Sequence, residues 1–311
     1  MSKSRPSPPT TVWVVVIVMC VLVGAVVAAN GVLTRQAAGA PTPSPRLQTS
    51  TSSDPAPTGP TTSVGPVAGA VIHWRPELRT GSLKVLDKHW FTIGYHERRK
   101  NPAWVTYELA GPISHPGPEP TRPATFATDF DTTAHVSHRD YTGSHYDRGH
   151  LAPAYAMWSR GGAEAFLATF VCSNTIPQPH AVNAGIWEDL ETRIAGRSSP
   201  HGGMPSSGGW AERYGAVTVV NGPIYGARVE TLRSGVGIPE VDFSVVIRNG
   251  PGGYQALAWE IPNVGDPAGP LDRYLTTIKQ IEDDAGLDFF AGDTQALRGQ
   301  LEMARATTLW P

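Results

Sequence analysis

Residues 146–153 read Tyr-Asp-Arg-Gly-His-Leu-Ala-Pro and place an acid, a base, a glycine and an imidazole at four consecutive positions. His150 can act as a general base, because histidine has the side-chain pKa nearest to neutral. Arg148 offers a planar fork of donors that suits phosphate oxygens, and Gly149 lets the backbone approach a ligand closely. The alternative is structural: Asp147 and Arg148 would form an ion pair beside one histidine among ten. The motif alone does not separate the two interpretations.

A second polar pattern lies on a helix predicted over residues 183–194, NAGIWEDLETRI. In a regular helix Asn183 falls on the apolar face that continues with Trp187, and Glu191 lies at the edge of that face. A buried amide and carboxylate need partners, and a hydrated cation would satisfy both. Mg²⁺ keeps several waters and accepts few protein ligands; Asn183 would bind it directly and Glu191 would hold a metal-bound water. The alternative is that Asn183 caps the helix and Glu191 is a surface residue.

Short β-rich segments outnumber the helical ones, and neighbouring segments are joined by short turns. They predict an α+β domain with a mixed, mostly antiparallel central sheet flanked by helices. No regular βαβ alternation with a Gly-rich loop is present, which argues against a dinucleotide-binding fold. The predicted strands are 83–86, 90–95, 101–109, 169–172, 216–220, 243–247 and 256–262, and the predicted helices lie within 154–170, 183–194 and 271–284.

Several motifs follow one another in a fixed order: DRGH at 147–150, SNTIPQ at 173–178, NAGIWEDLE at 183–191, with NPAW at 101–104, NGPIY at 221–225 and IEDDAGLDFF at 281–290. As an ordered set they resemble the DNA/RNA non-specific endonucleases, which include secreted bacterial nucleases and mitochondrial endonuclease G. The resemblance covers roughly residues 80–292. It implies the ββα-metal nuclease fold.

The resemblance also implies a division of roles in the site. His150 would be the general base that takes a proton from the attacking water. Asn183 would be the single direct protein ligand of Mg²⁺, for which Mn²⁺ is a substitute, and Glu191 would hold metal-bound water. The metal would stabilise the leaving 3′ oxygen, and the products would carry 5′-phosphate ends.

Four further residues complete the predicted site. Arg148 would contact the phosphate and offset charge in the transition state, and Asn174 would position the His150 side or the metal waters. Asp147 would support the loop, and Arg193 is a predicted substrate-binding residue. Family members often carry another arginine one turn beyond the helix glutamate, where this chain has Ala195. That departure concerns substrate affinity and rate more than the type of reaction.

Residues 12–29 contain no charged residue and follow Lys3 and Arg5. A run of this length can just span a bilayer, and the basic flank predicts residues 1–11 on the cytoplasmic side. A cleaved signal peptide is the alternative, although its apolar region is usually shorter. The catalytic domain is therefore expected outside the cytoplasm, either on the cell membrane through this anchor or secreted after cleavage.

The two other divisions of the chain follow from composition. Residues 30–66 are rich in Pro, Ser and Thr, which predicts a disordered linker. The domain with the nuclease motifs is expected over residues 67–311. The two cysteines, Cys20 and Cys172, do not predict a disulfide, and Cys172 is expected to be a buried thiol. His135 and His138 form an HxxH pair; loop histidines are favoured over a zinc site, since no other ligand of known spacing completes the set.

The sequence thus predicts an exported, Mg²⁺-dependent endonuclease that hydrolyses DNA and/or RNA, with a homodimer as a further candidate assembly. The net charge of -2 gives no basic signal for nucleic-acid binding, although a site with a bound cation does not need one. It motivates one alternative: a membrane-tethered nucleic-acid-binding or interaction module with a decayed nuclease site. A second alternative is a metal phosphoesterase that acts on nucleotides or extracellular phosphodiesters.

Overall fold

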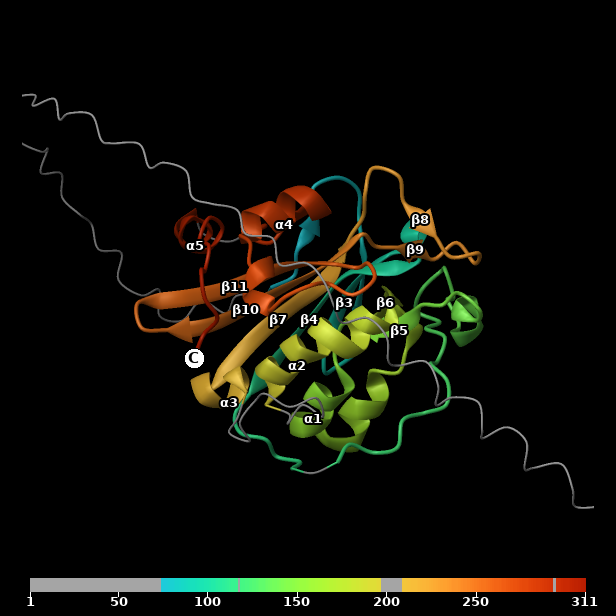
Figure 1. Ribbon diagram of the computed structural model, residues 1–311, viewed down its shortest axis with the longest axis horizontal. Coiled ribbons are helices and arrows are strands. Elements are labelled where there is room, and N and C mark those ends of the chain that lie inside the picture. Colours follow the sequence, from blue (N-terminus) through green and yellow to red (C-terminus); the bar gives the residue numbers. More distant parts are fainter. Residues whose placement is uncertain (1–73, 117, 197–208, 293–294) are drawn as a thin grey trace, which may run out of the picture. The chain divides into compact units, whose positions relative to one another are not determined.

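The computed structural model describes residues 74–116, 118–196, 209–292 and 295–311 (Figure 1). The predicted segments 1–11, 12–29 and 30–66 lie outside these described residues.

The described part of the chain is built on a six-stranded sheet in which every neighbouring pair is antiparallel, in the order β11-β10-β7-β4-β3-β2. β10 and β11 form a tight hairpin in which Gly252 and Gly253 have positive φ values of 90° and 115°, a conformation that favours glycine. The antiparallel character predicted for the central sheet is confirmed, but the described sheet is antiparallel throughout rather than mixed. Its strands are β2 Lys84–Asp87, β3 Thr92–His96, β4 Asn101–Ala110, β7 Ala216–Ile224, β10 Val241–Gly250 and β11 Gly253–Pro262.

Helices cover both faces of this sheet, so its strands carry apolar side chains on each face. In β7 Val219 packs in one buried cluster and Val220 in the other, and β10 divides Val246 and Val245 in the same way. Figure 1 shows the first three helices on one side of the sheet and the last two on the other. They are α1 Ala154–Ala168, α2 Trp187–Ala195 and α3 Trp210–Tyr214 on the first side, and α4 Ile278–Ala285 and α5 Gln295–Leu301 on the second.

Short elements complete the described domain. Three two-stranded sheets pair β1 Glu77–Leu78 with β12 Leu287–Asp288, β5 Asp147–His150 with β6 Thr175–Gln178, and β8 Glu230–Thr231 with β9 Gly237–Ile238. The 3₁₀ turns are η1 Glu97–Arg99, η2 His138–Tyr141, η3 Cys172–Asn174 and η5 Leu271–Tyr274, and η4 Val182–Ile186 is π-helical.

Two of the predicted elements are wrong in detail. The helix expected over 271–284 is divided, because Leu275 pairs with Trp259 of β11 and the second helix starts anew at the N-cap Thr277, whose side chain accepts from the Gln280 N–H. The strand expected over 169–172 is instead the end of α1 at Thr169, an isolated bridge from Val171 to Ala127 and the start of a 3₁₀ turn at Cys172, and the strand begins at Thr175.

Buried polar side chains dock the β5–β6 hairpin on the central sheet. Asn221 Nδ2 of β7 donates to Leu151 O at 2.7 Å, just beyond β5. Asn263 Nδ2 donates to Pro177 O at 2.9 Å, and Gln178 Nε2 donates to Asp242 Oδ2 of β10 at 2.7 Å. Backbone groups of the hairpin are thereby satisfied where water does not reach them.

The fully buried Asp242 makes the stability of this docking depend on pH. Burial raises the pKa of its carboxyl from 3.8 to about 8, against the opposite effect of the Gln178 hydrogen bond. Between these two values the unfolded chain ionises and the folded chain does not, so the free energy of unfolding falls as the pH rises. Asparagine imitates the neutral acid, and Asp242→Asn is expected to melt at a higher temperature than the parent at pH 8, with the gap closing toward pH 4. Thermal unfolding followed by circular dichroism from pH 4 to 9 measures this, and a pH-independent gap would contradict it.

Candidate active site

The hairpin β5–β6 and the helical segment after it form a ββα unit, the arrangement that the resemblance implied. Neither strand of this hairpin was among the strands predicted from the residues. His150 pairs with Thr175, and Asp147 pairs with Gln178 at the other end of the hairpin. Position 149 requires glycine, because a Cβ there would lie 1.8 Å from Oε1 of the buried Gln178. The close packing of the two strands aligns the polar ends of β5 with the start of the helix.

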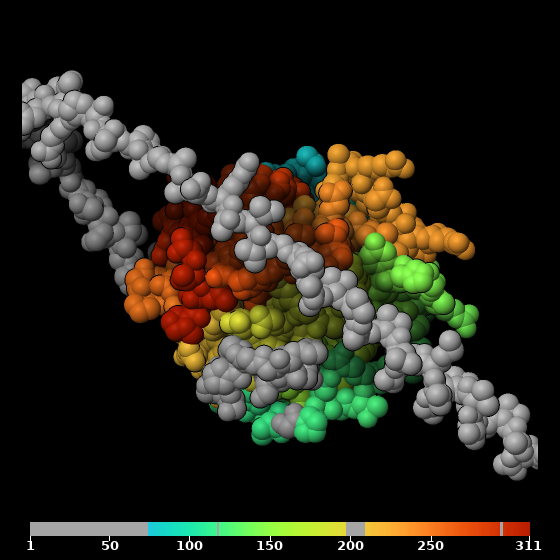
Figure 2. All heavy atoms as spheres, viewed as in Figure 1, coloured from blue at the N-terminus to red at the C-terminus, as the bar shows by residue number. Residues whose placement is uncertain are grey.

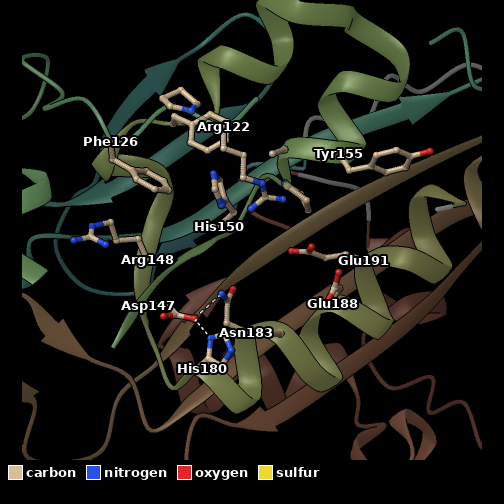
Figure 3. Close-up of a pocket in the computed structure, with 15 residues that line it drawn as sticks. Arg122, Phe126, Asp147, Arg148, His150, Tyr155, His180, Asn183, Glu188 and Glu191 are labelled. Carbon is tan, nitrogen blue, oxygen red and sulfur yellow. Dashed lines mark hydrogen bonds and ion pairs between the residues drawn. The ribbon is translucent and has the colours of Figure 1, made fainter. Parts of the chain in front are cut away.

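A pocket of 380 Å³ lies between this unit and the loop that precedes it (Figure 3). Five of the seven predicted site residues line it: Asp147, Arg148, His150, Asn183 and Glu191. The DRGH motif and the helical segment with Asn183 and Glu191 therefore meet at one cavity.

The π-helical segment η4 decides which residues of the helix face the pocket. A π turn contains an extra residue and is often found at functional sites, so the periodicity of a regular helix does not carry through it. Trp187 is buried in the core, whereas Asn183 is half-buried and lines the pocket with Glu188 and Glu191. The expectation that Asn183 shares the inward face of Trp187 is wrong for this reason. Nor is Asn183 a cap, since the residue before η4 is Ala181.

Asp147 orients the amide of Asn183. Its Oδ2 accepts a hydrogen bond from Asn183 Nδ2 at 3.0 Å and lies 2.8 Å from His180 Nδ1. A carboxylate can only accept, so the amino group of Asn183 must face Asp147, and its Oδ1 points into the pocket in Figure 3. The alternative of an Asp147–Arg148 ion pair is wrong, since within the described residues Asp147 pairs with His180.

Arg148 is held at the pocket by the neighbouring turn η2. Its Nη2 donates to His138 O at 2.8 Å, and its guanidinium lies over the Tyr141 ring at 5.2 Å. The β8–β9 segment lies beside η2 (Figure 2), where Ser234 Oγ donates to Asp140 O at 3.0 Å. These contacts fix the arginine while leaving it among the pocket-lining residues.

His150 is 8% exposed, and its Nε2 has no hydrogen-bond partner among the described residues. Burial lowers the pKa of its imidazole from 6.5 to about 3, and the charge of Arg122 lowers it further. The imidazole is therefore neutral around pH 7 and able to accept a proton. An anion bound in the pocket would favour the charged form that results.

Two predicted residues lie outside the pocket. Asn174 is fully buried; its Oδ1 accepts from Ala152 N at 2.9 Å, and its Nδ2 donates to Ala152 O at 3.0 Å and Thr169 O at 3.1 Å. It therefore fixes the backbone just after His150 rather than facing a ligand. Arg193 Nε donates to Asp189 Oδ2 at 3.2 Å along the outside of α2.

The pocket residues missed in the sequence include Arg122, Phe126, Tyr155, Phe170, His180 and Glu188. Glu188 had a signal, since it lies one turn before Glu191 on the same helix. Arg122 had none, because it belongs to a Pro-rich loop without periodicity. Its side chain is 53% exposed, which places the guanidinium at the rim of the pocket. There it forms an ion pair with Glu119 at 2.8 Å.

The remaining candidate groups have structural roles. His138 Nδ1 accepts from Phe126 N at 3.2 Å, and its ring stacks on that phenylalanine, so it is not a solvated loop histidine. The ranges that the structure describes hold no group of three or more His, Cys, Asp or Glu side chains suited to a metal. Cys172 is a buried thiol as expected, and burial raises its pKa to about 12.

The ββα unit, the antiparallel sheet and the order of motifs can be compared with known proteins. The family model described as DNA/RNA non-specific endonuclease matches residues 75–296. The chain belongs to the DNA/RNA non-specific endonuclease family. It is therefore a nuclease that hydrolyses nucleic acid, and the resemblance predicted from the motifs is confirmed.

Named relatives and a solved structure agree with this membership. Human mitochondrial endonuclease G is 30% identical over 246 residues, which cover 73% of this chain and 75% of that protein. The mitochondrial nuclease EXOG of Danio rerio is 26% identical over 224 residues, covering 64% of this chain and 58% of that protein. An EndoG/EndoGI crystal structure on the mechanism of EndoG inhibition has a chain with a TM-score of 0.57 and 22% identity, covering 69% of this chain and 89% of that one. The last match shows a shared fold.

The localisation predicted from residues 12–29 is corrected by two findings. In the part of the chain that the structure describes, no helix has the length and apolar character that a membrane crossing requires. The relatives named above are mitochondrial nucleases. Residues 12–29 lie outside the described residues, and a cell-membrane or exported location is not assigned to the chain.

Proposed function

We propose that this nuclease is a Mg²⁺-dependent, sugar-non-specific endonuclease that cuts DNA and RNA to 5′-phosphate ends, with His150 as general base. The proposal rests on one observation: His150, a proton acceptor, and Asn183, an oxygen ligand, line the same pocket. The neutral imidazole of His150 lines the pocket, with no partner for its Nε2 in the ranges that the structure describes, and Asp147 turns the amide oxygen of Asn183 into the same pocket.

The donor atoms at the helix fit a hard divalent cation. Asn183 supplies an amide oxygen, and Glu188 and Glu191 bring carboxylates to the same pocket, which are the ligand types that Mg²⁺ and Mn²⁺ prefer. Asn183 would bind the ion directly, and Glu191 would hold its water molecules. When bound, the ion supplies Lewis-acid stabilisation of the leaving 3′ oxygen.

The chain's own groups perform the rest of the reaction. Nε2 of His150 takes the proton from the attacking water. Arg148 and Arg122 offer positive charge to the phosphate oxygens, and Arg148 is already held in place by His138 O. Phosphates are alike in every nucleic acid, so a pocket that binds them through arginines carries little sequence information.

A substrate panel tests this proposal. The purified protein with Mg²⁺ is expected to cut circular double-stranded DNA, single-stranded DNA and RNA, and EDTA is expected to stop all three reactions. Products should accept a 5′ label only after phosphatase treatment. Absence of cleavage of every polymer would favour a nucleic-acid-binding module with a decayed site. Hydrolysis confined to mononucleotides or small phosphodiesters would favour the phosphoesterase alternative.

A further inference from the structure

In the described part of the chain, the His150 side chain has no polar partner of the kind that commonly orients a general base. In nucleophile–base arrangements a third group usually fixes the ring through a hydrogen bond. Among the residues that the structure describes, the imidazole of His150 accepts and donates no side-chain hydrogen bond, and its buried Nε2 has no partner. Its backbone pairs with Thr175 in the hairpin, but this pairing does not fix the rotation of the ring.

Two phenylalanines contact the imidazole instead. The Phe126 ring lies 5.0 Å from the His150 ring, centroid to centroid, at an interplanar angle of 46° (Figure 3). The Phe170 ring lies 5.1 Å away at 85°, which is an edge-to-face contact. Phe126 and Phe170 also touch each other at 5.3 Å. We call these two side chains the aromatic clamp.

The aromatic clamp is rigidly supported on both sides. Ala127 N donates to Phe170 O at 2.8 Å, so the two backbone segments that carry the clamp are bonded to each other. Phe170 packs on the fully buried Phe166 at 4.9 Å. On the other side, the Phe126 ring stacks on His138 at 6.3 Å and 21°. A clamp held in this way can fix a ring that lies against it.

Phe126 also lies close to Arg148, the proposed phosphate-binding residue. The guanidinium carbon of Arg148 is 6.0 Å from the centre of the Phe126 ring, within the range of a cation–π contact. One half-buried ring therefore contacts the base and borders the arginine.

We propose that Phe126, acting with Phe170, is a positioning residue that fixes the His150 imidazole and keeps water from it, in place of a hydrogen-bonding carboxylate. The inference rests on the proposed function, in which His150 is the base. An aromatic clamp restricts the rotamer by packing and, within the described residues, leaves the buried Nε2 without a charged partner.

The aromatic clamp also explains why His150 is neutral. Burial is the first cause of its lowered pKa, and Arg122 is the second. Removing the Phe126 ring would admit water and move the pKa back toward 6.5. The other charged and titratable groups that line the same pocket are Arg148 and Asp147 on β5, Tyr155 on α1, and His180, Glu188 and Glu191 on the helical side.

Three variants of the full chain test the role of Phe126. Phe126→Ala is expected to lower kcat about 10²-fold, as misplacement of a reacting group does. The acid limb of its pH–rate profile and the pKa of His150 should both move upward. That pKa is read by NMR from the imidazole carbon signal that His150→Gln removes. In Phe126→Leu, kcat, the acid limb and the pKa of His150 should each lie between those of Phe126→Ala and those of the parent. Phe130→Ala is the matched control, because Phe130 lies in the same loop with 80% of its surface exposed, and it should behave as the parent.

The same measurements can overturn the inference. Phe126 would have a merely structural role if Phe126→Ala lowered kcat but left the acid limb of the pH–rate profile and the His150 titration as in the parent. If Phe126→Ala does not fold, Phe126→Leu decides the question through the same two readouts. The NMR titration needs no hydrolysis, so it still tests the aromatic clamp if the parent cuts no nucleic acid and the proposed function fails.

Discussion

Replacing His150 with alanine is expected to lower the rate of phosphodiester hydrolysis by about 10²–10⁴-fold, the contribution usual for a positioned general base. The variant loses the buried, neutral imidazole of the pocket as a proton acceptor, and the attacking water keeps its proton. The fold should survive, because the side chain of His150 satisfies no buried polar group in the described residues. Cleavage of plasmid DNA in Mg²⁺ measures the loss, and circular dichroism checks the fold.

A second histidine of the same pocket provides the matched control for this experiment. His180 lies 2.8 Å from Asp147, and its side chain is 81% exposed. An exposed imidazole at the rim is not held against the reacting water, so His180→Ala is expected to lose less than about tenfold of the rate, well below a general-base contribution. If His180→Ala loses as much as His150→Ala, or if His150→Ala cuts at the parental rate, the assignment of the base is wrong.

The part of the site that could be predicted is the part that is close in sequence. β5, β6 and the helix after them follow one another within residues 147–195, and neighbouring elements usually pack together. The motifs that carry His150, Asn183 and Glu191 therefore point to one pocket. The strands of the central sheet could also be predicted from the sequence, because their long β-branched runs have the pattern of a sheet covered on both faces.

The rest depends on features that periodicity does not encode. The π turn before Trp187 moves Asn183 off the apolar face, and a regular-helix projection cannot show an inserted residue. Asn174 lies in a predicted motif, yet its amide is consumed by backbone groups of Ala152 and Thr169. Phe126 reaches the base through the contact of its loop with the segment of Phe170, and such a long-range pairing has no local signal.

Asn183→Ala is expected to have the second large effect on cleavage. It acts by weakening metal binding, whereas His150→Ala removes the proton acceptor. Its amide is the group that Asp147 turns toward the pocket, and the variant removes that oxygen. The Mn²⁺ affinity, measured by electron paramagnetic resonance, should fall by at least about 10–100-fold. A loss of that size is typical even when the mutated residue only hydrogen-bonds to a metal ligand. The Mg²⁺ concentration that supports half-maximal cleavage should rise in parallel. Asp189→Ala is the matched control, since Asp189 lies on the same helix and pairs with Arg193 at 3.2 Å.

The orientation of that amide can be tested separately from its presence. In Asp147→Asn the residue at 147 can offer an amino group as well as an oxygen, so it no longer forces the amino group of Asn183 to face it. Mn²⁺ affinity is then expected to fall by about 10–100-fold, the cost usual for losing the partner of a ligand, while the Asn183 oxygen is still present. Parental Mn²⁺ affinity in Asn183→Ala would exclude Asn183 as the ligand. Parental affinity in Asp147→Asn alone would show that the pocket orients the amide without the carboxylate.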